Sequence, residues 1–159
     1  MKHLPKHLQP RWRYLTVRLE TWPDGTLDRG PFQREVWYAA QNLLGDVASA
    51  DADLTVVRFE SWEGGAEAIV RVRRGESERA RAMLACVDAV GTDPVGLQVA
   101  GISGTVRACE EKYMRGPPER TEQRRVTVED AERSAVARNG RLDYRTDDGF
   151  TAGTELDTE

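Results

Sequence analysis

The chain has 159 residues, of which 31% are charged and 39% hydrophobic, so it can bury a core in one domain with an appendage. No apolar run approaches the roughly eighteen residues of a membrane-spanning helix, and we therefore expect a soluble protein. The basic N-terminus has no hydrophobic core or cleavage site, which argues against a secretory signal.

The net charge of −4 is unevenly distributed along the chain. Residues 1–116 hold 16 basic and 16 acidic side chains, whereas residues 117–159 hold 7 basic and 11 acidic ones, so the tail carries the whole net charge. Only three of the 23 basic residues are lysine. Abundant acid with arginine in place of lysine favours adaptation to high internal salt. Codon bias in a GC-rich genome would produce the same pattern.

The first predicted elements are a strand and a helix. Residues 12–21 alternate between apolar and polar side chains, which predicts a half-buried strand. Residues 31–45 have apolar side chains at helical spacing, with Asp28 placed to cap the helix and Gly45 to end it. A loop of small residues is expected after Gly45.

The next elements complete a seven-element order. Residues 54–73 predict a β-hairpin around the turn EGG, and Ser77 can cap a helix that continues to about residue 90. A strand over 95–103 and a helix over 104–114 follow. The resulting order is β-α-β-β-α-β-α.

This order predicts an α+β fold of the ferredoxin-like or RRM-like split βαβ type. A four-stranded antiparallel sheet would carry two helices on one face, with an extra C-terminal helix. The other face is expected to be open and to present Tyr14, Thr16, Arg18, Arg71 and Arg73. The aromatic RNP1 pattern is missing from AEAIVRVRRG, which argues against base stacking on the central strands.

We predict one α/β domain over 1–116 with a basic leader, and a polar, acidic tail over 117–159. One short helix is expected in the tail over 128–138, and the rest is expected to be disordered.

Few side chains suit catalysis or metal binding. The two histidines, His3 and His7, lie in the leader, and the chain has no phosphate loop, HExxH motif or zinc spacing. Cys86 and Cys109 are expected to be buried free thiols of a cytosolic protein. We predict no catalytic residue and no metal ligand in this chain.

Two segments are candidates for RNA contact. In the leader, basic side chains beside aromatic ones suit phosphate contact and stacking, although a solubilising tail would have a similar composition. The GISGTVR segment places small and hydroxyl residues before a helix, which suits either an anion cradle or a simple helix cap. With two arginines of the sheet, the candidate RNA-binding residues are Lys2, Lys6, Arg11, Arg13, Tyr14, Arg71, Arg73, Ser103, Gly104, Thr105 and Arg107.

KHLQPRWRYL at the start and GISGTVRACEEKYM after the last strand together resemble the archaeal ribonuclease P protein component 2 family, over about residues 2–115. The resemblance implies an RRM-like protein subunit of ribonuclease P, the cytoplasmic endoribonuclease that removes the 5′ leader of precursor tRNA. It implies that Mg²⁺ is held by the RNA subunit and not by the protein. The implied partners are the ribonuclease P RNA, precursor tRNA, component 3 and the other ribonuclease P proteins, with self-association into a heterotetramer with component 3.

One property departs from this resemblance, because ribonuclease P proteins are usually basic and this chain is acidic. Counterion release weakens at high salt, so RNA binding there would depend on oriented arginine contacts and stacking. Two alternatives are a generic RRM-like RNA-binding module and a ferredoxin-like regulatory domain that binds a small molecule.

Overall fold

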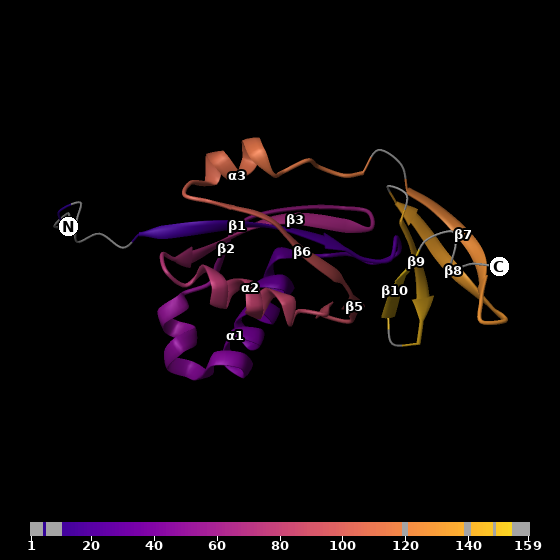
Figure 1. The fold of residues 1–159 in the computed structure, drawn as a ribbon, viewed down its shortest axis with the longest axis horizontal. Helices are drawn as coiled ribbons and strands as arrows, with labels where there is room; N and C mark the ends of the chain where they lie inside the picture. The colour runs from indigo at the N-terminus through magenta and orange to yellow at the C-terminus, as the bar shows by residue number, and fades with distance from the viewer. Residues whose placement is uncertain (1–4, 6–10, 119–120, 139–140, 148, 154–159) are drawn as a thin grey trace.

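The computed structural model describes residues 5, 11–118, 121–138, 141–147 and 149–153, which form two four-stranded antiparallel sheets (Figure 1). The first, here called the main sheet, has the strand order β2-β3-β1-β6. Its strands are β1 (Trp12–Glu20), β2 (Thr55–Trp62), β3 (Gly65–Arg73) and β6 (Gly96–Ser103). The helices are α1 (Arg29–Ala52), α2 (Ser77–Ala85) and α3 (Val106–Lys112), and a small hairpin joins β4 (Ala89–Val90) to β5 (Asp93–Pro94). The predicted ferredoxin-like α+β fold is confirmed.

Helices α1 and α2 cover one face of the main sheet and enclose the hydrophobic core (Figure 1). Side chains alternate between the two faces of a strand, so every second residue of β1 and β3 points to these helices. Leu15, Val17 and Leu19 of β1 are buried there against Phe32 of α1 and Met83 of α2. Within the described residues, no helix is long and apolar enough to cross a membrane.

The ends of the helices differ from the sequence prediction. Gly45 interrupts α1, because its φ of 78° and ψ of 173° are not helical, but a second helical stretch follows this kink and continues to Ala52. The helix ends where Asp53 adopts a left-handed conformation and donates its backbone N–H to the Ser49 carbonyl. Asp28 lies at the N-cap of α1 and Glu76, rather than Ser77, at the N-cap of α2, and neither side chain makes a capping hydrogen bond.

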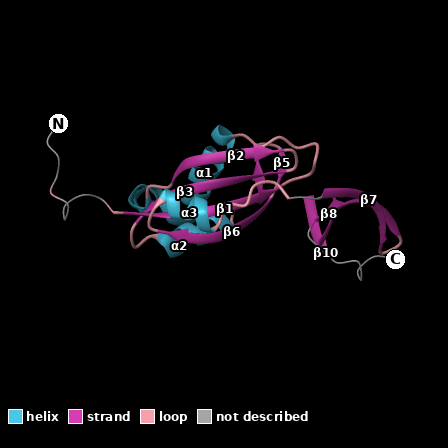
Figure 2. Cartoon of the chain, turned by 90° about the horizontal axis from the view of Figure 1, so that it is seen from above, coloured by secondary structure: helices cyan, strands magenta, loops and turns pink. Residues whose placement is uncertain are grey.

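The opposite face of the main sheet is partly covered by α3 and the segment after it, as Figure 2 shows from above. Thr16 on β1 and Glu67 and Ile69 on β3 are fully buried on this face. Tyr113 lies over Gly101, where an added Cβ would come within 2.3 Å of the ring. The predicted open face is therefore wrong for its middle part, because the last helix folds back over it.

The C-terminal residues form a second sheet, with the strand order β10-β9-β8-β7, instead of a helix and disordered chain. The strands of this C-terminal sheet are β7 (Thr121–Val128), β8 (Ala131–Arg138), β9 (Arg141–Thr146) and β10 (Gly149–Gly153). The predicted helix over 128–138 is thus wrong. Glu129 and Asp130 have φ values of 50° and 60° and make the tight turn between β7 and β8, as two residues with positive φ do in β-hairpins.

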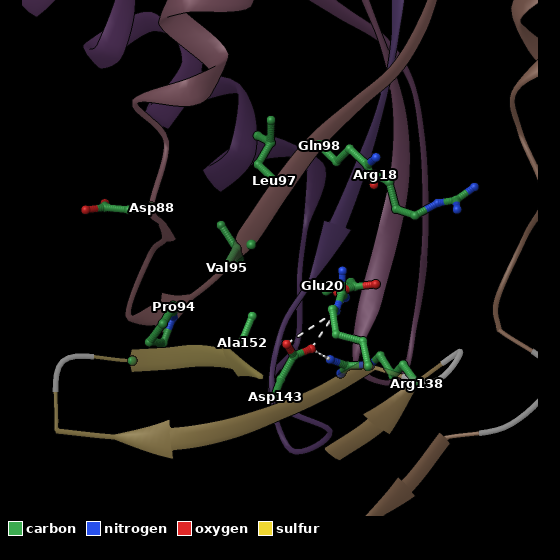
Figure 3. Close-up of a pocket in the computed structure, with 13 residues that line it drawn as sticks. Arg18, Glu20, Asp88, Pro94, Val95, Leu97, Gln98, Arg138, Asp143 and Ala152 are labelled. Atoms are coloured by element: carbon green, nitrogen blue, oxygen red, sulfur yellow. Dashed lines mark hydrogen bonds and ion pairs between the residues drawn. The ribbon is translucent and has the colours of Figure 1, made fainter. Parts of the chain in front are cut away.

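Arg138 attaches the C-terminal sheet to the main sheet. Its side chain is only 4% exposed and donates to the Thr21 carbonyl at 2.6 Å, the Gly64 carbonyl at 3.4 Å and the Asp143 carboxylate at 3.2 Å. Figure 3 shows Arg138 beside Asp143, and Arg141 adds ion pairs with Glu20 of β1 and with Asp143. These contacts close one side of a cleft of about 440 Å³ between the two sheets.

Candidate nucleic-acid interface

Arginines from both central strands gather where β1 begins and β3 ends. The antiparallel register places Trp12 opposite Arg73 and Tyr14 opposite Arg71. The backbone N–H of Arg74 donates to the Arg11 carbonyl at 2.9 Å and extends this pairing beyond the strands. We call this group the basic end of the main sheet; it contains Arg11, Arg13, Arg71, Arg73 and Arg74.

Trp12 orients two of these arginines. The guanidinium carbon of Arg71 lies 4.0 Å from the centre of the Trp12 ring, and that of Arg73 lies 5.4 Å from it. Cation–π contacts of this kind favour one orientation of each guanidinium group. Arg71 is half-buried beneath this stack, whereas Arg73 is exposed.

Acidic side chains neutralise little of the basic end. Arg73 lies 3.8 Å from Asp53, and both side chains are more than 40% exposed, so this ion pair contributes about 0–1 kcal/mol. Within residues 11–118, Arg11, Arg13 and Arg74 form no ion pair. Their charges therefore remain available to an anionic partner.

The start of α3 adjoins the basic end. A Cβ placed on Gly104 would lie 3.6 Å from Nη1 of Arg13. The Thr105 hydroxyl accepts the backbone N–H of Ala108 at 3.1 Å, so the capping role of this residue is observed. Arg107 is exposed and pairs with Glu111 at 2.9 Å, one turn further along the helix.

Arg58 fastens α3 to the main sheet. It extends from β2 and forms ion pairs with Glu60 on its own strand and Glu110 on α3. These hydrogen bonds, first with Glu60 and then with Glu110, raise the pKa of the Arg58 guanidinium. The cation therefore stays charged, and the start of α3 keeps its position beside β1.

The structure brings many of the predicted RNA-binding residues together. Arg13 and Tyr14 lie on β1, and Ser103 pairs with Tyr14 at the end of β6. On β3, Arg71 lies opposite Tyr14 and Arg73 lies opposite Trp12. Lys2 and Lys6 lie outside the described residues. The sequence analysis missed Arg74 and the role of Trp12 in holding two arginines; the basic run RVRRG at the end of the hairpin was the available signal.

The described part of the chain contains no cluster of side chains suited to metal binding. No group of three or more His, Cys, Asp or Glu side chains there could hold a metal ion. Both cysteines are free thiols; Cys109 is buried as predicted, whereas Cys86 is exposed. The prediction of two buried thiols is therefore wrong for Cys86, which lies at the end of α2.

Comparison with known proteins identifies the family. A family model described as the Rpp14/Pop5 family matches residues 13–114. A protein of Haloarcula marismortui named ribonuclease P protein component 2 is 62% identical over 99% of both chains. A protein of the same name from Halorubrum lacusprofundi is 56% identical over the full length of both chains.

A more distant relative matches only part of the chain. The ribonuclease P protein component 2 of Methanosarcina mazei is 32% identical over 72% of this chain and 93% of its own length. The halophile relatives therefore match the C-terminal sheet as well as the main sheet, whereas the Methanosarcina match leaves more than a quarter of this chain unmatched. The extent of the family match and the identity of these relatives show that the chain belongs to the Rpp14/Pop5 family.

Proposed function

We propose that this chain is a protein subunit of ribonuclease P and that the basic end of its main sheet contacts the RNA. Family membership and the shared name of the relatives support the subunit role. The observation that supports the RNA contact is the presence of five arginines at one end of the sheet, three on the paired strands β1 and β3 and two, Arg11 and Arg74, directly beyond them. Guanidinium groups match phosphate geometry through two parallel hydrogen bonds, so oriented arginines suit a phosphate backbone.

The catalytic step belongs, in this proposal, to the RNA subunit and to Mg²⁺ held by that RNA. The described residues offer no cluster of metal ligands, so the protein is assigned binding and positioning. It supports the RNA in removing the 5′ leader of precursor tRNA. Component 3, the other ribonuclease P proteins and a second copy of this chain are its proposed protein partners.

A high salt concentration inside the cell would explain why the chain uses arginine rather than lysine. The relatives from Haloarcula, Natronomonas and Halorubrum support a cell interior rich in salt. Screening there removes most of the non-specific attraction of a basic protein for RNA. Oriented guanidinium groups such as Arg71 and Arg73, held over Trp12, keep short-range contacts under these conditions.

The start of α3 lies beside this interface, but the proposal does not depend on RNA contacts made by it. RNA contacts by Ser103, Gly104, Thr105 and Arg107 stay a prediction, because the Thr105 hydroxyl is already used by the cap. The same holds for Lys2 and Lys6 in the leader. The exposed arginines of the strands are the stronger test of the proposal.

The decisive experiment removes two of these arginines in the full assembly. We would combine Arg73→Ala with Arg74→Ala, reconstitute the holoenzyme with its RNA and protein subunits, and measure RNA footprint, cleavage rate and melting temperature. Each lost charged hydrogen bond is worth about 1.5–3 kcal/mol, so RNA affinity should fall at least tenfold. Arg125→Ala is the matched control, because Arg125 is exposed on the C-terminal sheet and paired with Glu132.

Two results would contradict the proposal. An unchanged footprint together with impaired capture of component 3 would show that the basic end contacts protein. Cleavage of precursor tRNA by the purified protein in Mg²⁺ without the RNA subunit would refute the assignment of catalysis to the RNA.

A further inference from the structure

A second, smaller cleft lies on the α3 side of the junction between the two sheets. Its volume is about 240 Å³. It is bounded by β1, by the β2–β3 turn and by residues 115–118, the linker that leads to the C-terminal sheet. We call it the linker cleft. It is smaller than the roughly 300–1,000 Å³ of pockets for drug-sized molecules, so it suits a single ring system.

Glu67 holds the linker in place over the sheet. This carboxylate is fully buried and accepts the backbone N–H groups of Arg115 at 3.1 Å and Gly116 at 2.5 Å. It also pairs with Arg18 at 3.0 Å. Because backbone groups make the contacts, the Arg115 side chain is not needed for them.

The walls of the linker cleft combine flat apolar surfaces with cations. Trp62 lines the cleft from the end of β2, and Pro117 and Pro118 line it from the linker. Arg115 also lines it and is exposed, with no ion pair to another described residue. An indole ring next to a free guanidinium group suits a nucleobase and its phosphate, since bases stack on aromatic rings and phosphates pair with arginine.

The larger cleft in Figure 3 lacks this combination. Arg138 and Arg141 line it, and both pair with Asp143. No tryptophan is among its lining residues in the described chain. Arg138 lines the linker cleft as well, and Arg18 there pairs with Glu67. Arg115 is therefore the arginine of the linker cleft that remains available to a ligand, because it forms no ion pair with a described residue.

We propose that the linker cleft binds one unpaired nucleotide of an RNA strand, with the base on Trp62 and the phosphate on Arg115. This proposal rests on the RNA-binding function proposed above and adds a second contact, at the far end of the sheet from the basic end. Exposed residues such as Glu63 and Thr121 line the rim, so the RNA strand can enter and leave the cleft. Neither Trp62 nor Arg115 belongs to the basic end.

The test uses the full chain and short unstructured oligouridylate and oligoadenylate as probes, at low salt and in molar KCl. Trp62→Leu should lower affinity roughly five- to 150-fold, which corresponds to about 1–3 kcal/mol of stacking, and the loss should persist in molar KCl. Trp62→Phe should restore part of the affinity. Arg115→Gln should lower affinity at low salt while the bonds of its backbone to Glu67 remain.

Matched controls separate local from general effects. Trp37→Leu removes an exposed indole from α1, and Arg125→Gln removes an exposed guanidinium from β7; neither should change the affinity. A lower melting temperature of Trp62→Leu would indicate that this variant is misfolded. In that case the proposal is tested by Arg115→Gln and by a photo-cross-link from 4-thiouridine in the oligouridylate to the wild-type protein. A cross-link within residues 62–64 or 115–118 supports the proposal.

The outcomes distinguish this proposal from the function on which it rests. If the wild-type protein binds RNA and both variants bind it equally well, the linker-cleft proposal fails and the basic end remains. If the wild-type protein binds no RNA, the proposed function fails too. Equal affinity for uridine monophosphate and for the oligonucleotide, or loss only of a protein partner's binding, would also overturn the assignment to an RNA strand.

Discussion

The main sheet buries rows of aliphatic side chains beneath two helices, whereas the C-terminal sheet rests on its neighbour through arginine. The hydrophobic core cluster under α1 and α2 runs from Leu15 to Val95 in the chain. In the described part of the C-terminal sheet, the buried apolar side chains are Val128, Ala135, Val136 and Leu142. A sheet with so small a core gains much of its stability from the surface on which it docks.

This difference teaches how an added element can be stabilised without enlarging the core. Arg138 uses carbonyl groups that the β1–α1 loop and the β2–β3 turn already present. The Methanosarcina relative is matched over 93% of its own length but over only 72% of this chain. This comparison predicts that single substitutions alter the stability and hydrogen exchange of the two sheets to different extents.

The largest expected effect is that of Arg138→Ala. The substitution removes the buried donor of the Thr21 carbonyl and the buried partner of Asp143, and removing one partner of a buried ion pair costs about 3–5 kcal/mol. Chemical denaturation should show this loss, and hydrogen exchange should show faster exchange within 121–138 than in β1. Arg125→Ala should change stability by less than about 1 kcal/mol. An equally small effect of Arg138→Ala would mean that other contacts hold the C-terminal sheet.

The next effect is that of Glu67→Gln. The amide cannot form the ion pair with Arg18 and offers a weaker acceptor to the N–H groups of Arg115 and Gly116, which should cost about 1.5–3 kcal/mol. Hydrogen exchange at the backbone amides of Arg115 and Gly116 should become faster by more than exchange at the main-sheet amides. Glu63→Gln, at an exposed position, is the control. Unaltered exchange at both amides would refute the role of Glu67 in holding the linker.

The main sheet could be predicted because its pattern of side chains follows from its burial. Alternation at Leu15, Val17 and Leu19 reports a strand with one face toward the core, and the turn EGG separates two β-branched runs. The covering of the opposite face by α3 was not predicted, because a buried Glu67 looks like a surface residue in the sequence. Its partners are backbone N–H groups 48 and 49 residues away.

The C-terminal sheet could not be predicted because local and tertiary preferences conflict there. Residues 128–138 are rich in Ala, Glu and Arg, which favour helix in isolation. Pairing with β7 and β9 overrides this preference. The turn at Glu129 and Asp130 has positive φ without a glycine or asparagine, so the usual hairpin signal is missing. Of the candidate site, all the arginines except Arg74 were predicted from charge, but their meeting at one end required the register of β1 and β3.

A smaller effect is expected for Thr105→Ala. Loss of the hydroxyl that accepts the Ala108 N–H should destabilise the fold by about 1 kcal/mol, measured by thermal denaturation. Ser103→Ala, which removes a hydroxyl that makes no capping bond to α3, should have a smaller effect. If RNA affinity falls while stability is unchanged, the helix start contacts RNA rather than merely capping α3.

The smallest effect concerns salt. Residues 117–159 carry 11 acidic and 7 basic side chains, whereas residues 1–116 are balanced. Lowering the salt concentration from molar KCl increases repulsion among the acids of the tail, so the C-terminal sheet should exchange its amides faster while the main sheet changes little. The expected loss is below about 1 kcal/mol. Equal acceleration in both sheets would contradict a local origin.

The two acceptors of Arg138 also determine the order in which the chain can assemble. The Thr21 N–H donates to the Gly64 carbonyl at 3.0 Å, so Arg138 meets both carbonyls only after the ends of β1 and β3 have come together. Pairing of β1 with β3 and β6 joins distant parts of the chain and is slow, whereas β7 to β10 pair with sequential neighbours and can form quickly. Attachment of the C-terminal sheet therefore has to wait for the main sheet and becomes the final step of folding.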